Sequence, residues 1–103
     1  MDRIEKLREY LLSKPGDAFL QHALALEYVK LGREEEARLL FTEILERDPA
    51  YTGSYYHLGK LLERTGHTDE AVTWYEKGMK ACQETGDRHA YGELRGAYEE
   101  LTF

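Results

Sequence analysis

The chain has 103 residues, enough for one domain, and is 42% hydrophobic and 33% charged, which is too apolar for a disordered chain and too polar for a membrane protein. No segment approaches the roughly 18 consecutive apolar residues of a membrane span. Its 14 Lys and Arg residues against 20 Asp and Glu residues give a net charge of -6, which argues against nucleic-acid binding because such binding relies on neutralising phosphates.

Two helices are predicted at the start of the chain. Apolar residues at helical spacing indicate a helix over residues 2–12, which ends at the segment 14–16 because its proline cannot continue a helix. Asp17 is placed to cap a second helix over residues 18–31. The apolar residues of this second helix are so dense that we expect it to be contacted on more than one side.

Four more helices are predicted in the rest of the chain. The third opens with the acidic residues 34–36, which suit the positive end of the helix dipole, and closes at Asp48. The fourth spans residues 51–64, and Thr68 is placed to cap the fifth. A break over residues 83–87 separates the fifth helix from the last one. No segment alternates polar and apolar residues as a strand would, so the predicted fold is all-α.

The sequence repeats itself with a step of 34 residues. Five marker residues of the first cycle each fall on a similar residue of the second. The matches are Pro15 on Pro49, Leu24 on Leu58, Gly32 on Gly66, Ala37 on Ala71 and Phe41 on Tyr75. A fixed period of this length is the signature of a helical solenoid. Solenoids display extended surfaces, so the repeat bears directly on function.

The last helix departs from this period. A step of 34 residues from Leu58 reaches Gly92, which cannot serve as a core residue, whereas a step of 36 reaches Leu94. We therefore predict an insertion of two residues in the loop 84–87 and a last helix that acts as a cap. Arg95 stands where an internal repeat would have a small residue, which agrees with a terminal helix that has one exposed side.

These residues resemble the tetratricopeptide repeat, a helix–turn–helix unit of 34 residues. The first repeat matches with Leu24, Ala25, Tyr28, Gly32, Ala37, Phe41, Ile44 and Pro49. The second matches with Tyr55, Leu58, Gly59, Leu62, Gly66, Ala71, Tyr75 and Gly78, while Gln83 replaces the proline. The resemblance implies about six antiparallel helices in a right-handed superhelix. The units are a half repeat 1–17, repeats 18–51 and 52–85, and a C-terminal capping helix 86–103.

The repeat pattern assigns most of the tyrosines to the core. Small residues such as Ala25, Gly59 and Gly78 permit close approach of helices, and aromatic rings fill the remaining space. The tyrosines at core positions are Tyr28, Tyr55, Tyr75, Tyr91 and Tyr98, and Tyr10 is expected to join them through the half repeat. Only Tyr51 and Tyr56 are then left as candidate recognition groups.

Signals for catalysis, a cofactor or a metal are absent. The sequence has no glycine-rich phosphate loop, no Gly-x-Ser-x-Gly elbow and no His-Glu-x-x-His helix. His22 and His57 could lie on neighbouring first helices and share a metal, or they could be ordinary surface histidines. Cys82 is expected to be a small, partly buried residue because no activating base is indicated, and one cysteine permits no internal disulfide. With no apolar signal segment at the N-terminus, we expect a cytoplasmic protein.

The resemblance places function on the concave face, which the first helix of each repeat lines. Its candidate partner-binding residues are Phe19, His22, Leu26, Lys30, Tyr56, His57, Lys60 and Arg64. Phe19 and Leu26 are apolar beyond what the core needs, so they either contact a partner or are covered by the half-repeat helix.

Some family members hold the C-terminal carboxylate of chaperone tails with a clamp of Lys, Asn and Arg. Here His22 and Leu26 occupy two of those places and the chain has no asparagine, so we do not expect that activity. These residues allow another mode of binding, in which a peptide stacks on Tyr56 and its carboxylate pairs with Lys60 or Arg64.

We therefore predict a non-catalytic interaction module that binds a peptide or partner protein on its concave face, with no nucleic acid and no membrane as a partner. The alternative is self-association, in which two copies form a homodimer through their apolar terminal helices.

Overall fold

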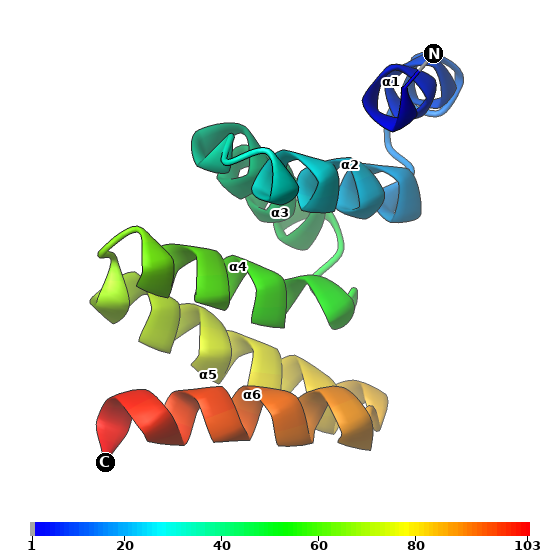
Figure 1. Ribbon diagram of the computed structural model, residues 1–103. Coiled ribbons are helices and arrows are strands. Elements are labelled where there is room, and N and C mark those ends of the chain that lie inside the picture. The colour runs from blue at the N-terminus through cyan, green and yellow to red at the C-terminus, as the bar shows by residue number, and fades with distance from the viewer. Residues whose placement is uncertain (1) are drawn as a thin grey trace.

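The computed structural model describes residues 2–103, over which six helices follow one another through short turns (Figure 1). They are α1 (Arg3–Ser13), α2 (Ala18–Lys30), α3 (Glu34–Arg47), α4 (Gly53–Arg64), α5 (Thr68–Thr85) and α6 (Arg88–Thr102). In Figure 1, α2, α4 and α6 lie in front, with α3 and α5 behind them. No strand occurs within residues 2–103, so the chain is an all-α solenoid. Met1, the first residue of the expected half repeat 1–17, lies outside the described residues.

Local signals fix most helix ends where the sequence predicts them. The Asp17 carboxylate accepts a hydrogen bond from the Leu20 backbone N–H at 3.0 Å and so caps α2, as predicted. Helix α3 begins at Glu34, within the predicted acidic segment. The turns after α2 and α4 place Gly32 and Gly66 at φ values of 75° and 86°, a backbone conformation that glycine adopts without strain.

The predictions for α5 were wrong at both ends. Thr68 is the first helical residue and not the cap; His67 holds the cap position, and its side chain makes no capping hydrogen bond. At the other end the helix does not break at Gln83 but continues to Thr85, because the residue that stops it is Gly86, with a φ of 77°. A glycine in the left-handed backbone conformation ends a helix effectively, whereas a run of polar residues can continue in helical conformation.

Consecutive helices pack against one another and enclose one apolar core. Small residues of the repeat pattern lie at its closest contacts: Ala25, Ala37 and Ala71 are fully buried. Large side chains fill the space between them, and Phe41 and Tyr75 are also fully buried. Cys82 is 1% exposed, so it is more deeply buried than predicted, and burial raises the pKa of its thiol.

The tyrosines divide differently from the prediction in α1 and α6. Tyr28, Tyr55 and Tyr75 are buried as expected, whereas Tyr91 and Tyr98, also expected in the core, are half-buried against it. Tyr10 was wrongly placed in the core, because its side chain is 58% exposed. Helix α1 packs mainly against α2, so only the side of α1 that carries the buried Leu7 is covered.

Helix α6 follows the re-phased register. Leu94 is fully buried, whereas Gly92 is exposed, as the step of 36 residues predicts. Arg95 is exposed and pairs with Glu99, whose Oε2 lies 3.6 Å from Nε of Arg95. None of the helices over residues 2–103 is both long enough and apolar enough to cross a bilayer.

Candidate functional site

The exposed sides of α2, α4 and α6 carry most of the residues that the sequence singled out. In a helix, a residue two positions from a buried one is rotated about 200° away from it. The buried Leu24 and Leu58 therefore direct their neighbours two positions away toward the surface. We call this surface the α2–α4–α6 face; its residues are His22, Leu26, Tyr56, His57, Lys60, Glu93 and Glu100.

A cluster of rings joins α2 to α4 within this face. The ring centroid of His22 lies 5.3 Å from that of His57, 5.6 Å from that of Phe41 and 5.8 Å from that of Tyr51. A hydrogen bond of 2.8 Å links Nδ1 of His22 to the hydroxyl of Ser54, which is fully buried at the start of α4. This hydrogen bond holds the ring of His22 in place at the centre of the cluster.

The two histidines of the cluster are neutral at pH 7. Burial lowers the pKa of His22 to about 4, and the charge of His57 acts in the same direction. Burial also lowers the pKa of His57, while the carboxylate of Glu93 opposes that shift. The structure thus brings His22 and His57 together as a shared metal site would require. Within residues 2–103, however, no three side chains of the ligating types are arranged to hold a metal ion.

Lys60 lies between α4 and α6 against one ring and two carboxylates. Its Nζ atom is 5.7 Å from the ring centroid of Tyr56. The same atom is 3.6 Å from Oε2 of Glu63 and 3.9 Å from Oε2 of Glu100. Glu63 also accepts a hydrogen bond from the hydroxyl of Tyr75, and burial together with that carboxylate raises the pKa of Tyr75.

The other two basic residues among the predicted partner-binding residues also have carboxylate partners. Nε of Arg64 is 3.7 Å from Oε2 of Glu34, and Nζ of Lys30 is 3.0 Å from Oε2 of Glu27. A peptide carboxylate that bound Lys60 or Arg64 would have to displace a carboxylate of the chain itself. The direct electrostatic gain of such a contact would be reduced accordingly.

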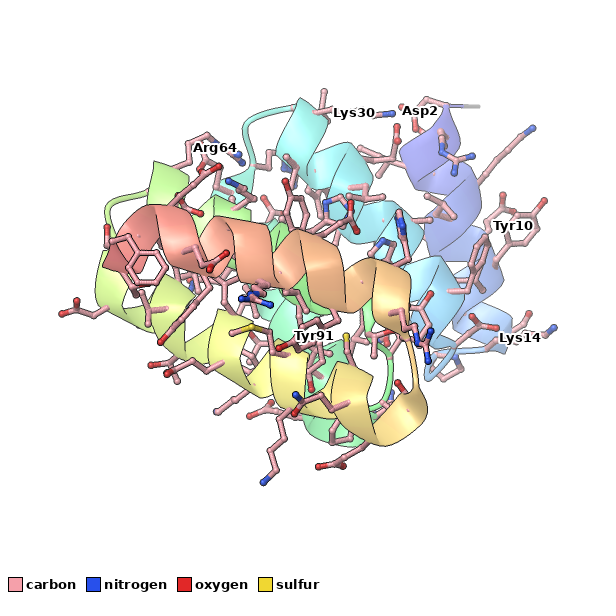
Figure 2. The ribbon with its side chains drawn as sticks, turned by 90° about the horizontal axis from the view of Figure 1, so that it is seen from below. Asp2, Tyr10, Lys14, Lys30, Arg64 and Tyr91 are labelled. Atoms are coloured by element: carbon pink, nitrogen blue, oxygen red, sulfur yellow. The ribbon has the colours of Figure 1, made fainter. Side chains whose placement is uncertain are left out.

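Phe19 lies toward the α1 end of α2 and is 69% exposed, so α1 does not cover it. It lines a small hollow of about 240 Å³ together with Tyr10, Lys14 and Leu20. Figure 2 shows Tyr10 and Lys14 at this edge of the molecule, with Arg64 at the opposite edge of the view. Leu26, in contrast, is half-buried against the core.

Sequence reasoning missed two carboxylates of the α2–α4–α6 face, Glu93 and Glu100. The step of 36 residues that aligns the last helix takes His57 to Glu93 and Arg64 to Glu100, so the sequence does carry a signal for both. The role of Ser54 had no sequence signal, since nothing marks a serine as the partner of a histidine in another helix.

A larger hollow of about 610 Å³ lies on the other side of the molecule, between α3 and α5. The single tryptophan of the chain, Trp74, lines it beside Tyr55. Nζ of Lys77 lies 4.5 Å from the centroid of the Trp74 ring. The lining carries charges of both signs, among them Lys80 and Glu84.

The family model for the tetratricopeptide repeat matches residues 1–82, and the chain therefore belongs to the tetratricopeptide repeat family. A tetratricopeptide repeat domain protein from Salinibacter ruber is 41% identical, with a TM-score of 0.80 over 84% of this chain and 96% of that one. The TPR repeat-containing protein PA0015 of Pseudomonas aeruginosa is 29% identical over 91 residues, 88% of this chain and 87% of that protein. The TPR2B domain of yeast Sti1, solved in a complex with pHsp70, is similar in fold alone, at 17% identity and a TM-score of 0.88 over 96% of this chain and 79% of that one.

Proposed function

We propose that this chain is a non-catalytic protein-interaction module and that its α2–α4–α6 face binds a peptide or an extended segment of a partner protein. The observation that carries the proposal is the ring cluster of this face: His22, Tyr51 and His57 are half-buried, and the ring of His22 is fixed by its hydrogen bond to Ser54. Half-exposed aromatic side chains in a fixed arrangement suit recognition, because little conformational freedom is lost on binding.

Family membership supports this proposal, because repeat solenoids expose extended surfaces of this kind to their partners. The yeast Sti1 domain, whose fold is similar, was solved in a complex with pHsp70, so a chain of this fold can present a surface to another protein. The face also offers apolar contact area beside the rings through Leu26.

The proposal is tested by selecting binders from a random library of 12-residue phage-displayed peptides on the immobilised chain. Binding of the enriched peptides, synthesised with a fluorophore, is then measured by anisotropy to the wild type and to Tyr56→Ala. Loss of an aromatic anchor typically costs 1–2 kcal/mol, so we expect Tyr56→Ala to weaken binding about tenfold.

The matched control is Tyr10→Ala, which removes an equally large and more exposed ring from α1. We expect it to leave the affinity unchanged. Enriched peptides that bind Tyr56→Ala as tightly as the wild type would place recognition elsewhere, for example at the hollow beside Trp74.

A second function, self-association, is favoured by the exposed apolar residues near the N-terminal end. Leu12 of α1 is 84% exposed, and Tyr10 and Phe19 are 58% and 69% exposed. Exposed apolar residues that gather at one end of a domain are a common feature of contact surfaces between copies. We propose this as the alternative role of the chain.

A further inference from the structure

We infer that the peptide bound by the α2–α4–α6 face carries a Lys or Arg side chain next to its apolar residues, and that Lys60 occupies the place of that side chain in the unbound protein. This inference rests on the proposed function and adds the chemical class of its ligand.

The surroundings of Lys60 are those that suit a ligand cation. An aromatic ring, that of Tyr56, and the carboxylates of Glu63 and Glu100 all lie around its ammonium group. Aromatic faces and carboxylates are the two kinds of group that attract Lys and Arg most strongly. Both N–O distances, 3.6 and 3.9 Å, exceed the roughly 2.8 Å of a charge-assisted hydrogen bond. Lys60 is therefore held loosely enough to be displaced.

The charges of the face favour a basic partner over an acidic one. Glu93 and Glu100 of the face, together with Glu63 beside it, contribute three carboxylates, against the one ammonium group of Lys60. Arg64 adds little positive charge because it pairs with Glu34. The two histidines are uncharged at pH 7 because burial lowers the pKa of each.

Glu93 and Glu100 are accessible to a partner. Their side chains are 49% and 74% exposed. Among the described residues, the ion pair of Glu93 is with the ring of His89, 3.7 Å away, which is itself 90% exposed and carries a charge only when protonated. The other ring that feels this carboxylate, that of His57, has its pKa lowered by burial. Because the two residues are seven positions apart, they lie on the same side of α6, two helical turns from each other.

An acidic peptide would be repelled by the same carboxylates. To pair with Lys60 it would have to draw this residue away from Glu63 and Glu100, and it would itself lie close to both carboxylates. Like charges held that close oppose binding. The overall charge of the chain, -6, acts in the same direction at longer range.

The test uses the library selection described above, carried out on the full wild-type chain, and reads the charge of the enriched 12-residue peptides. We expect Lys and Arg to be enriched. An enriched peptide is then titrated against single variants by anisotropy. Glu93→Gln and Glu100→Gln should each weaken binding about 2–5-fold, the usual effect of an exposed ion pair. Lys60→Gln should strengthen binding by a similar factor, because it removes the internal competitor.

Glu43→Gln is the matched control, since Glu43 is an exposed carboxylate of α3 and its replacement changes the net charge of the chain by the same amount. The inference is overturned if Glu43→Gln weakens binding as much as the α6 variants, because attraction would then be general. A second outcome would also overturn it: enriched peptides that are acidic or neutral and that bind Lys60→Gln more weakly than the wild type. If the binding of these peptides still depended on Tyr56, the proposed function would stand. Binding that is insensitive to Tyr56→Ala would refute the proposed function itself.

Discussion

The ring of Tyr75 lies directly against the Cα atom of Gly59, so that a Cβ atom at position 59 would lie 2.6 Å from Cζ of that ring. The contact has a counterpart in the same pair of helices: a Cβ atom at Gly78 would lie 2.7 Å from Cβ of Tyr55. Each of α4 and α5 therefore contributes one glycine and one tyrosine to their joint surface. Neither helix could approach the other this closely with a larger residue at either glycine.

Gly59→Ala is expected to destabilise the fold. Alanine favours helix by about 1 kcal/mol relative to glycine, but overpacking a dense core typically costs 1–3 kcal/mol. The ring of Tyr75 is fully buried and has no free direction in which to move. We therefore expect a net loss of up to about 2 kcal/mol in the free energy of unfolding, measured by urea denaturation followed by circular dichroism. An unchanged or higher midpoint would show that the ring can be displaced.

The same substitution in α6 is expected to have the opposite effect. Gly92 and Gly96 lie inside the helix, are exposed, and have no atom within 4 Å of the position of an added Cβ. Alanine at such a site stabilises a helix by about 0.5–1 kcal/mol. Gly92→Ala and Gly96→Ala should therefore each raise the urea midpoint, and the double variant should add the two effects. Destabilisation by either would mean that the glycine has a neighbour that the structure does not show.

The fold could be predicted from sequence because the repeat fixes which side of each helix is buried. The step of 34 residues pairs Ala37 with Ala71 and Phe41 with Tyr75, and all four are fully buried. The misplaced Tyr10 has a different origin. Its exposure depends on whether another helix packs against the outer side of α1, which the pattern within α1 does not encode.

The candidate site was predictable in part. Helical register placed Tyr56 and Lys60 beside the core residues of α4, and in the structure both are half-buried. Helical register could not tell which Lys and Arg side chains would be paired with carboxylates, because the Lys60–Glu100 and Arg64–Glu34 pairs join different helices. Their formation depends on side-chain geometry between elements and not on spacing along the chain.

Stability is expected to depend on pH through His22. Its pKa is about 4 in the folded chain and about 6.5 when unfolded, so between these values the unfolded state binds more protons. The contribution of His22 is therefore complete above pH 6.5 and is lost as the pH falls toward 4. Allowing for partial solvent exposure, we expect a loss of about 1–2 kcal/mol, measured by urea denaturation at a series of pH values.

His22→Gln is the control for this titration, because glutamine keeps a hydrogen-bonding group near Ser54 but has no proton to gain. The carboxylates of the chain titrate in the same range and affect both proteins equally. The difference in unfolding free energy between wild type and variant should therefore shrink between pH 6.5 and 4. A constant difference would mean that His22 is protonated as easily in the folded chain as in the unfolded one.

Self-association through the N-terminal end predicts a concentration-dependent sedimentation coefficient at about 10–100 µM. Leu12→Ser and Phe19→Ser replace highly exposed apolar side chains, so neither should lower the stability of the monomer. Each should weaken the dimer about tenfold if its side chain is buried between copies. Leu39→Ser is the matched control, since Leu39 is 53% exposed on α3, away from that end. A wild-type chain that remains monomeric over this range would exclude the alternative role. The side chains of Leu12 and Phe19 would then stay in water at these concentrations and would stabilise no contact between copies.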